Sequence, residues 1–174
     1  MLRLLLLRHA KAAVLAGGGD HARPLTTRGQ DDARHLGGWL EAGAGAPDTA
    51  LVSDARRARE TFDFLAAGLA HAPAAQLEPR LYNAAAETLL TLARAGPSGA
   101  RTQLLIGHNP GIAELALDLT GYGDRYAASR MRAKYVTCGL AILDFDIEAW
   151  AQLQPRAGRL DSFITPATLG GEDD

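Results

Sequence analysis

The segment Leu2–Leu7, which reads LRLLLL, is followed at once by the charged pair Arg8-His9. An apolar run without regular polar alternation is typical of a strand that is buried on both faces of a sheet. Such strands occur in parallel sheets that helices cover on both sides. The segment therefore predicts a buried N-terminal strand that delivers Arg8 and His9 to the edge where open α/β sheets form their sites.

The rest of the chain alternates between strand and helix patterns. Strands are predicted at 49–53, 76–81, 103–106, 140–145 and, as an edge strand, 160–164. Helices are predicted from Thr26 or Thr27 to 42 and at 56–70, 84–95 and 110–119, and a loop at 10–20 contains the glycine run 17–19. Because strands separated by helices indicate parallel pairing, the expected fold class is α/β, as a single three-layer α/β/α sandwich with a mostly parallel sheet. One domain is expected over 1–169, followed by a disordered acidic tail at 170–174.

Composition excludes several classes of protein. The 174 residues correspond to one domain of roughly 150 residues, and the net charge of −2 disfavours nucleic-acid binding, which needs excess basic residues. The single cysteine, Cys138, excludes a disulfide framework and a cysteine-based zinc cluster. No apolar run approaches the ~20 residues of a membrane span, and the N-terminal run is too short for a signal peptide. We therefore expect a cytoplasmic protein with neither a nucleic-acid nor a membrane partner.

Polar side chains follow three of the predicted strands at their carboxyl ends. The first strand ends in Arg8-His9, another ends at Ser53 just before an arginine-rich helix start, and a third leads into His108. Carboxyl ends of parallel strands meet at one edge of a sheet, so these side chains are expected to converge. Arginine forks match phosphate oxygens and stay charged, which indicates a site for a phosphoryl group.

Such a cluster can transfer a phosphoryl group without a metal ion. A neutral histidine can act as the nucleophile, because flanking arginines lower its pKa by like-charge repulsion. A second histidine can stay protonated beside a bound phosphate and stabilise charge in the transition state. No two histidines have the helical spacing of a zinc site, and the arginines near His9 and His108 would repel a cation. We therefore expect neither a metal nor another cofactor.

At this point the sequence resembles a known family. Residues 8–11 (RHAK) resemble the RHG signature of the histidine phosphatase superfamily, the phosphoglycerate-mutase-like enzymes. Residues 53–61 (SDARRARET) resemble its second arginine motif, and 107–108 (GH) resemble its second-histidine motif. Residues 23–29 (RPLTTRG) and 81–82 (LY) are similar to the SixA-type phosphohistidine phosphatase branch. The resemblance implies a phosphoglycerate-mutase-like fold and a phosphatase activity.

The resemblance also implies roles for individual residues. His9 would be the nucleophile that forms a phosphohistidine intermediate, and Arg8, Arg57 and His108 would bind the phosphoryl oxygens. The motif spacing selects Arg57 over its neighbouring arginines. Ala10 stands where the family usually has glycine. Alanine is the smallest replacement for glycine, so a ligand should still be able to approach the backbone there.

Three further side chains are candidates for substrate contacts, each with a plainer alternative. Lys11 can contact phosphate or lie in solvent, Arg23 can bind substrate or form a structural ion pair with Asp20, and Asn109 can bind substrate or shape a turn. The short chain lacks the inserted segment from which larger relatives supply a proton donor. Asp20 and Glu87 are the remaining candidates for that donor.

The missing donor indicates the type of bond that is broken. An alkoxide leaving group needs a proton, and general-acid help is worth roughly 10²–10⁴-fold, whereas an imidazole with a pKa of about 6.5 leaves readily. We therefore expect a metal-independent phosphohistidine phosphatase that acts on a histidine-phosphorylated signalling protein. The alternatives are a small-molecule phosphomonoesterase of the same superfamily and a catalytically inactive phosphate-binding module.

Overall fold

Strand β1 lies at the centre of the sheet that carries the site. The computed structural model describes residues 1–14 and 18–174, and these form a seven-stranded sheet in the order β3-β2-β4-β1-β6-β7-β5. The strands are β1 (Leu2–Arg8), β2 (Thr49–Val52), β3 (Ala75–Leu77), β4 (Thr102–Gly107), β5 (Thr120–Gly123), β6 (Leu140–Phe145) and β7 (Gly158–Ile164). The pairs β1–β4, β2–β4, β2–β3 and β5–β7 are parallel, whereas β1–β6 and β6–β7 are antiparallel. The sheet is therefore mostly parallel, as predicted.

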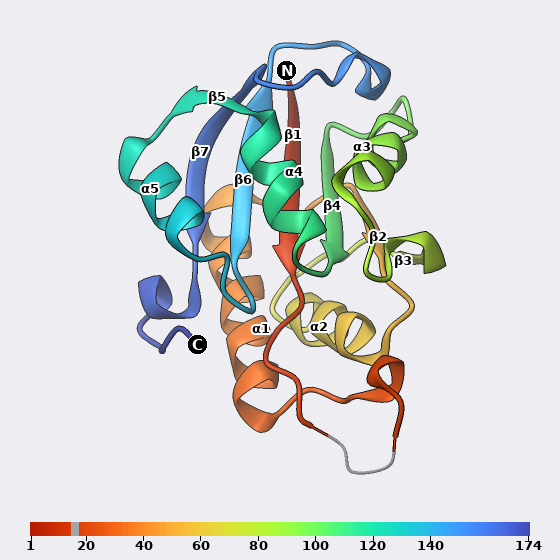
Figure 1. Cartoon of the computed structure of the whole chain (residues 1–174), viewed down its shortest axis with the longest axis vertical. Helices are drawn as coiled ribbons and strands as arrows, with labels where there is room; N and C mark the ends of the chain where they lie inside the picture. The colour runs from red at the N-terminus through yellow and green to blue at the C-terminus, as the bar shows by residue number, and fades with distance from the viewer. Residues whose placement is uncertain (15–17) are drawn as a thin grey trace.

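Helices cover both faces of this sheet. They are α1 (Thr27–Trp39), α2 (Arg56–Ala66), α3 (Ala86–Arg94), α4 (Gly111–Leu119) and α5 (Arg125–Ala133). Apolar residues of α3, α4 and α5 share one buried cluster with one face of the sheet, and residues of α1 and α2 share a second cluster with the other face. Figure 1 shows α4 lying in front of the central strands. The predicted three-layer α/β/α sandwich is confirmed.

The leucine run of β1 contributes to both clusters. Leu4 and Leu6 lie in the cluster with α3 and α4, whereas Leu5 and Leu7 lie in the cluster with α1 and α2. Successive side chains of a strand point to opposite faces, so a strand between two helical layers must be apolar at almost every position. The apolar run therefore predicts the strand correctly. Because β1 is central in the sheet, its carboxyl end lies in the middle of the row of strand ends.

The structure corrects the prediction near the far edge of the sheet. Strand β7 was expected at the edge, but it lies between β6 and β5, and β5 is the edge strand there. Neither β5 nor α5 is predicted from the sequence, because β5 (TGYG) contains two glycines and α5 (RYAASRMRA) has small or polar residues at most positions. The predicted strand at 76–81 is shorter, since β3 gives way to a 3₁₀ turn at Pro79–Leu81, where proline has no N–H to donate.

Two terminal or loop segments were also singled out by the sequence. Of the glycine run 17–19, Gly17 lies outside the described residues. The acidic tail 170–174, expected to be disordered, is described in contact with the domain: the Asp174 carboxylate accepts hydrogen bonds from the Thr137 N–H (3.1 Å) and from Lys11 Nζ (3.2 Å). Opposite charge accounts for the second contact. Among the described residues, no helix combines the length and apolarity that crossing a membrane requires.

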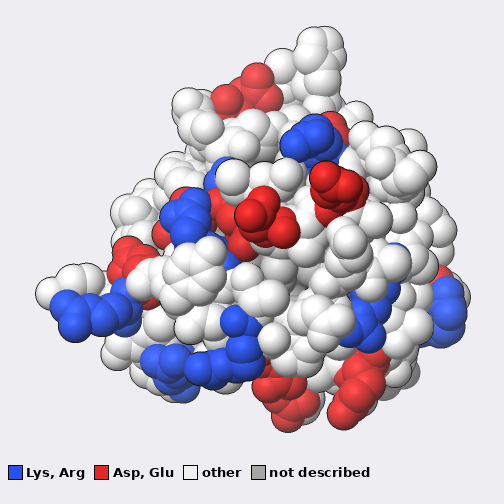
Figure 2. Space-filling view, turned by 90° about the horizontal axis from the view of Figure 1, so that it is seen from above, with Lys and Arg blue, Asp and Glu red and all other residues white. Residues whose placement is uncertain are grey.

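Charges are mixed on the end of the molecule that Figure 2 shows. Basic and acidic side chains are interspersed there, in keeping with a net charge near zero. The buried Asp144 on β6 binds Arg3 on β1 (2.7 Å) and Arg159 on β7 (2.6 Å). These ion pairs tie the antiparallel strands to the central strand.

Candidate active site

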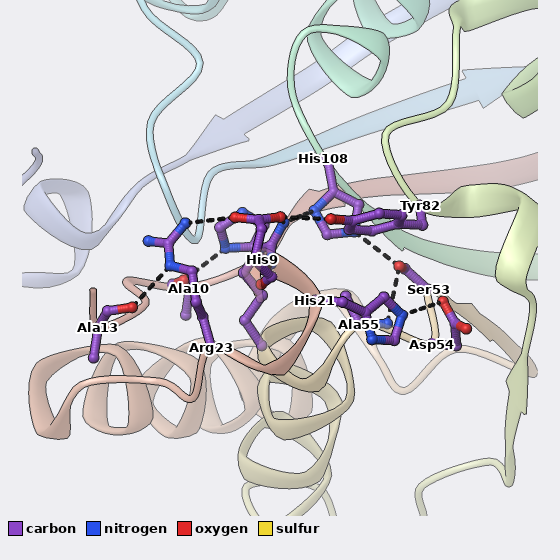
Figure 3. A network of polar contacts seen from close by, with 12 residues as sticks. His9, Ala10, Ala13, His21, Arg23, Ser53, Asp54, Ala55, Tyr82 and His108 are labelled. Carbon is purple, nitrogen blue, oxygen red and sulfur yellow. Dashed lines mark hydrogen bonds and ion pairs between the residues drawn. The ribbon is translucent and has the colours of Figure 1, made fainter. Parts of the chain in front are cut away.

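The carboxyl ends of β1 and β4 bring two histidines together. Arg8 pairs with Gly107 in the parallel ladder, so the residues that follow, His9 and His108, leave adjacent strands at the same level. Their ring centroids are 5.1 Å apart. Figure 3 shows both rings in one polar network with Ser53 and Tyr82. The side chains that the sequence placed at three separate strand ends thus meet at one place.

The ring of His9 is oriented by its own backbone neighbours. Nδ1 lies 2.8 Å from the carbonyl oxygen of Ala10, which can only accept a hydrogen bond, so Nδ1 carries the proton and Nε2 keeps a lone pair. The N–H of Ala10 in turn donates to Oγ1 of Thr61 on α2 (2.9 Å). Helix α2 therefore fixes the backbone of Ala10, whose carbonyl oxygen holds the His9 ring.

His9 is neutral at ordinary pH. It is 8% exposed, and burial lowers its pKa to about 4, with further lowering by the cations of Arg57, Arg8 and Arg23. The hydrogen bond to the carbonyl of Ala10 opposes this shift without reversing it. A neutral imidazole with a free Nε2 lone pair is a nucleophile, so the site can support covalent catalysis.

His108 is held between a guanidinium and a hydroxyl. Nδ1 lies 3.2 Å from Nη2 of Arg57, and Nε2 lies 2.8 Å from Oγ of Ser53. Burial, followed by the nearness of His9 and Arg57, lowers the pKa of His108 to about 3. It is therefore neutral in the substrate-free protein. His108 is expected to become protonated only when a phosphate dianion binds beside it, because a nearby negative charge raises the pKa of a histidine.

Arg57 is the buried arginine of the first turn of α2, whereas Arg56 and Arg59 are exposed. Its Nη1 donates to the main-chain oxygen of Asp20 (2.7 Å), and its Nη2 donates to Oδ2 of the same residue (3.0 Å). Arg57 is the arginine of this turn that contacts His108. A guanidinium in this position can bind an anion that lies against both histidines.

Two buried donors at the site have no partner. In the described part of the chain, the Nε atoms of Arg8 and Arg57 are buried and make no hydrogen bond. Leaving a buried donor unpaired costs about 1–3 kcal/mol, so such groups are rare and call for an explanation. The unpaired donors therefore mark these two arginines as unusual. Arg8 is fixed by a bond from Nη1 to the carbonyl oxygen of Tyr135 (2.9 Å), and Nδ2 of Asn109 donates to the same oxygen (2.9 Å).

The other candidates from the sequence take different positions. Lys11 pairs with Asp174 at 3.2 Å, and Arg23 pairs with Asp20 at 3.0 Å, which is the structural alternative for Arg23. Arg23 still contributes charge to the surroundings of His9. The structure corrects the expectation that Glu87 could donate a proton. Glu87 lies in the first turn of α3 and lines a separate cavity with Leu115 and Pro155.

Asp20 lies at the site but is not poised to donate a proton. Hydrogen bonds from the Tyr82 hydroxyl and from Arg23 lower its pKa well below the ordinary range of a carboxyl group, with Arg57 adding to the effect. Asp20 is thus ionised in the substrate-free protein. No role is predicted for Tyr82, yet its hydroxyl donates to Asp20 (2.6 Å) and its ring packs edge-on against His108 at 5.4 Å. The position of Tyr82 in motif 81–82 was the available signal.

The described residues contain no group of three or more histidine, cysteine or acidic side chains that could hold a metal ion. The cations of Arg8 and Arg57 lie near His9, and the carboxylate of Asp20 is exposed. The site thus combines positive charge with a neutral imidazole.

Comparisons with known proteins agree with this geometry. Residues 4–96, more than half of the chain, match the family described as the histidine phosphatase superfamily (branch 1). An uncharacterised protein of Mycobacterium tuberculosis is 38% identical over 166 residues, which cover 92% of this chain and 99% of the relative. A candidate phosphohistidine phosphatase SixA from Nakamurella multipartitia has a similar structure, with a TM-score of 0.82, 27% identity, and coverage of 94% of this chain and 95% of the other. The structure of a protein histidine phosphatase SixA with tungstate has a TM-score of 0.74 and 25% identity, over 97% of this chain and 99% of the other.

Proposed function

The chain belongs to the histidine phosphatase superfamily, in its SixA-type branch, and from this premise we propose that it is a phosphohistidine phosphatase with His9 as its nucleophile. The observation that carries the proposal is the neutral, buried His9 beside the cations of Arg8 and Arg57. Their guanidinium groups suit the oxygens of a phosphoryl group.

In the first step, Nε2 of His9 attacks the phosphorus atom of the substrate phosphohistidine. A bond forms between Nε2 and phosphorus while the bond from phosphorus to the substrate imidazole breaks. The electron pair of the broken bond stays on the leaving nitrogen, and a substrate ring protonated on its other nitrogen departs as neutral imidazole. Nδ1 of His9 keeps its proton throughout and donates a hydrogen bond to the carbonyl oxygen of Ala10.

In the second step, water attacks the phosphorus atom of phosphorylated His9. The bond to Nε2 breaks, its electron pair returns to Nε2, and the water protons leave with the phosphate as H₂PO₄⁻. Arg8, Arg57 and His108 are proposed to hold the phosphoryl oxygens in both steps. Fixed positive charges that meet charge in the transition state are usually the largest contribution to such catalysis.

The states of the two candidate proton donors support phosphohistidine over an alkyl phosphate as the substrate. Asp20 is ionised and Glu87 lies elsewhere, so neither is placed to protonate an alkoxide. An imidazole needs no such help, because its pKa of about 6.5 makes it a good leaving group. The intact set of Arg8, Arg57 and both histidines also favours turnover over mere phosphate binding. We propose a histidine-phosphorylated signalling protein as the partner.

The test compares hydrolysis of a phosphohistidine-bearing protein with hydrolysis of glycerol phosphate, both in the presence of a chelator. We expect fast loss of phosphohistidine and slow ester turnover. His9→Ala should lower the rate at least about 10³-fold, since the nucleophile is lost, while exposed His35→Ala serves as the matched control. Faster turnover of glycerol phosphate than of phosphohistidine would contradict the proposed substrate. Only the assignment of His9 as the nucleophile would then stand.

A further inference from the structure

The guanidinium that should bind the phosphoryl group already holds an anion in the substrate-free protein. Oδ2 of Asp20 accepts a hydrogen bond from Nη2 of Arg57 at 3.0 Å, and the main-chain oxygen of Asp20 accepts from Nη1 at 2.7 Å. Arginine binds carboxylates and phosphates through the same outward-facing N–H groups. The Asp20 carboxylate therefore stands where a phosphoryl oxygen would be expected.

Two further side chains donate hydrogen bonds to the Asp20 carboxylate. Its Oδ1 accepts from Nη1 of Arg23 (3.0 Å), and its Oδ2 also accepts from the hydroxyl of Tyr82 (2.6 Å). Figure 3 shows Arg23 and Tyr82 approaching from opposite sides of this network. Asp20 is thus a specifically bound anion on a phosphoryl-binding arginine.

A phosphoryl dianion and this carboxylate cannot share Nη2 of Arg57, since two anions in contact repel each other. A phosphoryl dianion carries more negative charge than the carboxylate, so the cations of Arg8 and Arg57 attract it more strongly. It also has the oxygen atoms to replace the carboxylate on Arg57. An incoming monocarboxylate only exchanges one carboxylate for another.

We propose that Asp20 is a specificity-determining residue: its carboxylate competes for Arg57, so that the site admits phosphoryl groups and rejects carboxylate anions. The inference rests on the proposed role of Arg57 in phosphoryl binding. The contact from the main-chain oxygen of Asp20 to Nη1 can persist when the side chain leaves. Specificity here comes from a built-in repulsive element, because any anion must displace Asp20 before it can bind.

The experiment measures binding of tungstate, inorganic phosphate and acetate to the purified protein by calorimetry. Asp20→Asn keeps the shape and removes the charge, and Asp20→Ala removes the group; Asp31→Asn, an exposed carboxylate of α1 paired only with Arg34, is the matched control. We expect both Asp20 variants to bind tungstate and phosphate about tenfold more tightly, the effect of removing one charged competitor. Acetate binding should become measurable in Asp20→Ala alone. Circular dichroism checks that each variant is folded.

Unchanged or weaker anion binding in both folded variants would overturn the inference, because Asp20 would then orient Arg57 without competing. A structure of the tungstate complex with Asp20 still bonded to Nη2 of Arg57 would overturn it as well. These readouts need no turnover. Tighter anion binding without phosphohistidine hydrolysis would therefore support the inference and contradict the proposed function. Phosphohistidine hydrolysis with unchanged anion binding in the variants would contradict the inference and support the proposed function.

Discussion

Nη2 of Arg57 lies 3.2 Å from Nδ1 of His108, and this contact fixes the protonation state of the histidine. A guanidinium has only donors, so Nδ1 must accept and cannot carry a proton. The neutral ring then carries its proton on Nε2, which donates to Oγ of Ser53 at 2.8 Å. One arginine therefore orients the second histidine and holds it neutral before substrate arrives.

Ser53→Ala is expected to lower kcat about tenfold. The substitution leaves the buried Nε2–H of His108 without an acceptor, which costs about 1–3 kcal/mol and loosens the ring. The measurement is steady-state phosphohistidine hydrolysis, with exposed Ser98→Ala as control. An unchanged kcat would show that the hydroxyl does not position His108.

The histidines of the site are expected to titrate at unusually low pH. Burial lowers the pKa of His9 to about 4 and that of His108 to about 3. NMR titration of the ring protons should show two signals with these low midpoints, each assigned by its loss in His9→Asn or His108→Asn. A midpoint near the ordinary value of about 6.5 for either signal would contradict the burial that the structure gives these rings.

The same shifts predict a loss of stability in acid. Between about pH 6.5 and about pH 4 the unfolded chain protonates His9 while the folded protein does not, so the free energy of unfolding falls as pH falls. Thermal unfolding from pH 7 to pH 5 should therefore show a decreasing Tm. His9→Asn should flatten this dependence. An equally steep decrease in the variant would assign the acid sensitivity to other groups.

Arg57→Lys should lower kcat/KM by about 10²–10³-fold. Lysine keeps the charge but loses the planar fork, and it cannot bond His108 and a phosphoryl oxygen in the same geometry. Arg59→Lys, on the exposed side of the same helix, is the matched control and should retain full activity. If both variants lost activity equally, the motif-based choice of Arg57 would be wrong.

Asp144→Asn should destabilise the fold by about 2 kcal/mol without changing kcat. The carboxylate is 5% exposed and binds Arg3 and Arg159 on neighbouring strands, so the variant loses charge-assisted hydrogen bonds at the sheet. The partial exposure of both arginines keeps the loss below that of a fully buried pair. Urea unfolding measures the effect. A loss below about 0.5 kcal/mol would mean that solvent screens these pairs almost completely.

The fold was predictable where one short segment carried its own signal. The leucines of β1 predict a strand that is buried on both faces, and the apolar runs of β4 and β6 do the same. A strand between two helical layers needs apolar residues on both of its faces. Segment 120–133 carried no such signal. Its strand β5 contains two glycines, and its helix α5 has small or polar residues at most positions, so contacts with β7 and α4 define them.

By itself the sequence determined that Arg8-His9, Arg57 and His108 leave elements whose ends share one sheet edge, since strand direction and motif spacing are local properties. Only the tertiary structure decided what meets these groups. Asp20 and Tyr82 are 62 positions apart in the chain, yet they join in a hydrogen bond beside Arg57, and Glu87 lies in a separate cavity. Contacts between distant segments follow from how the layers pack, and so do the lowered pKa values of the two histidines, which depend on burial that no local pattern specifies.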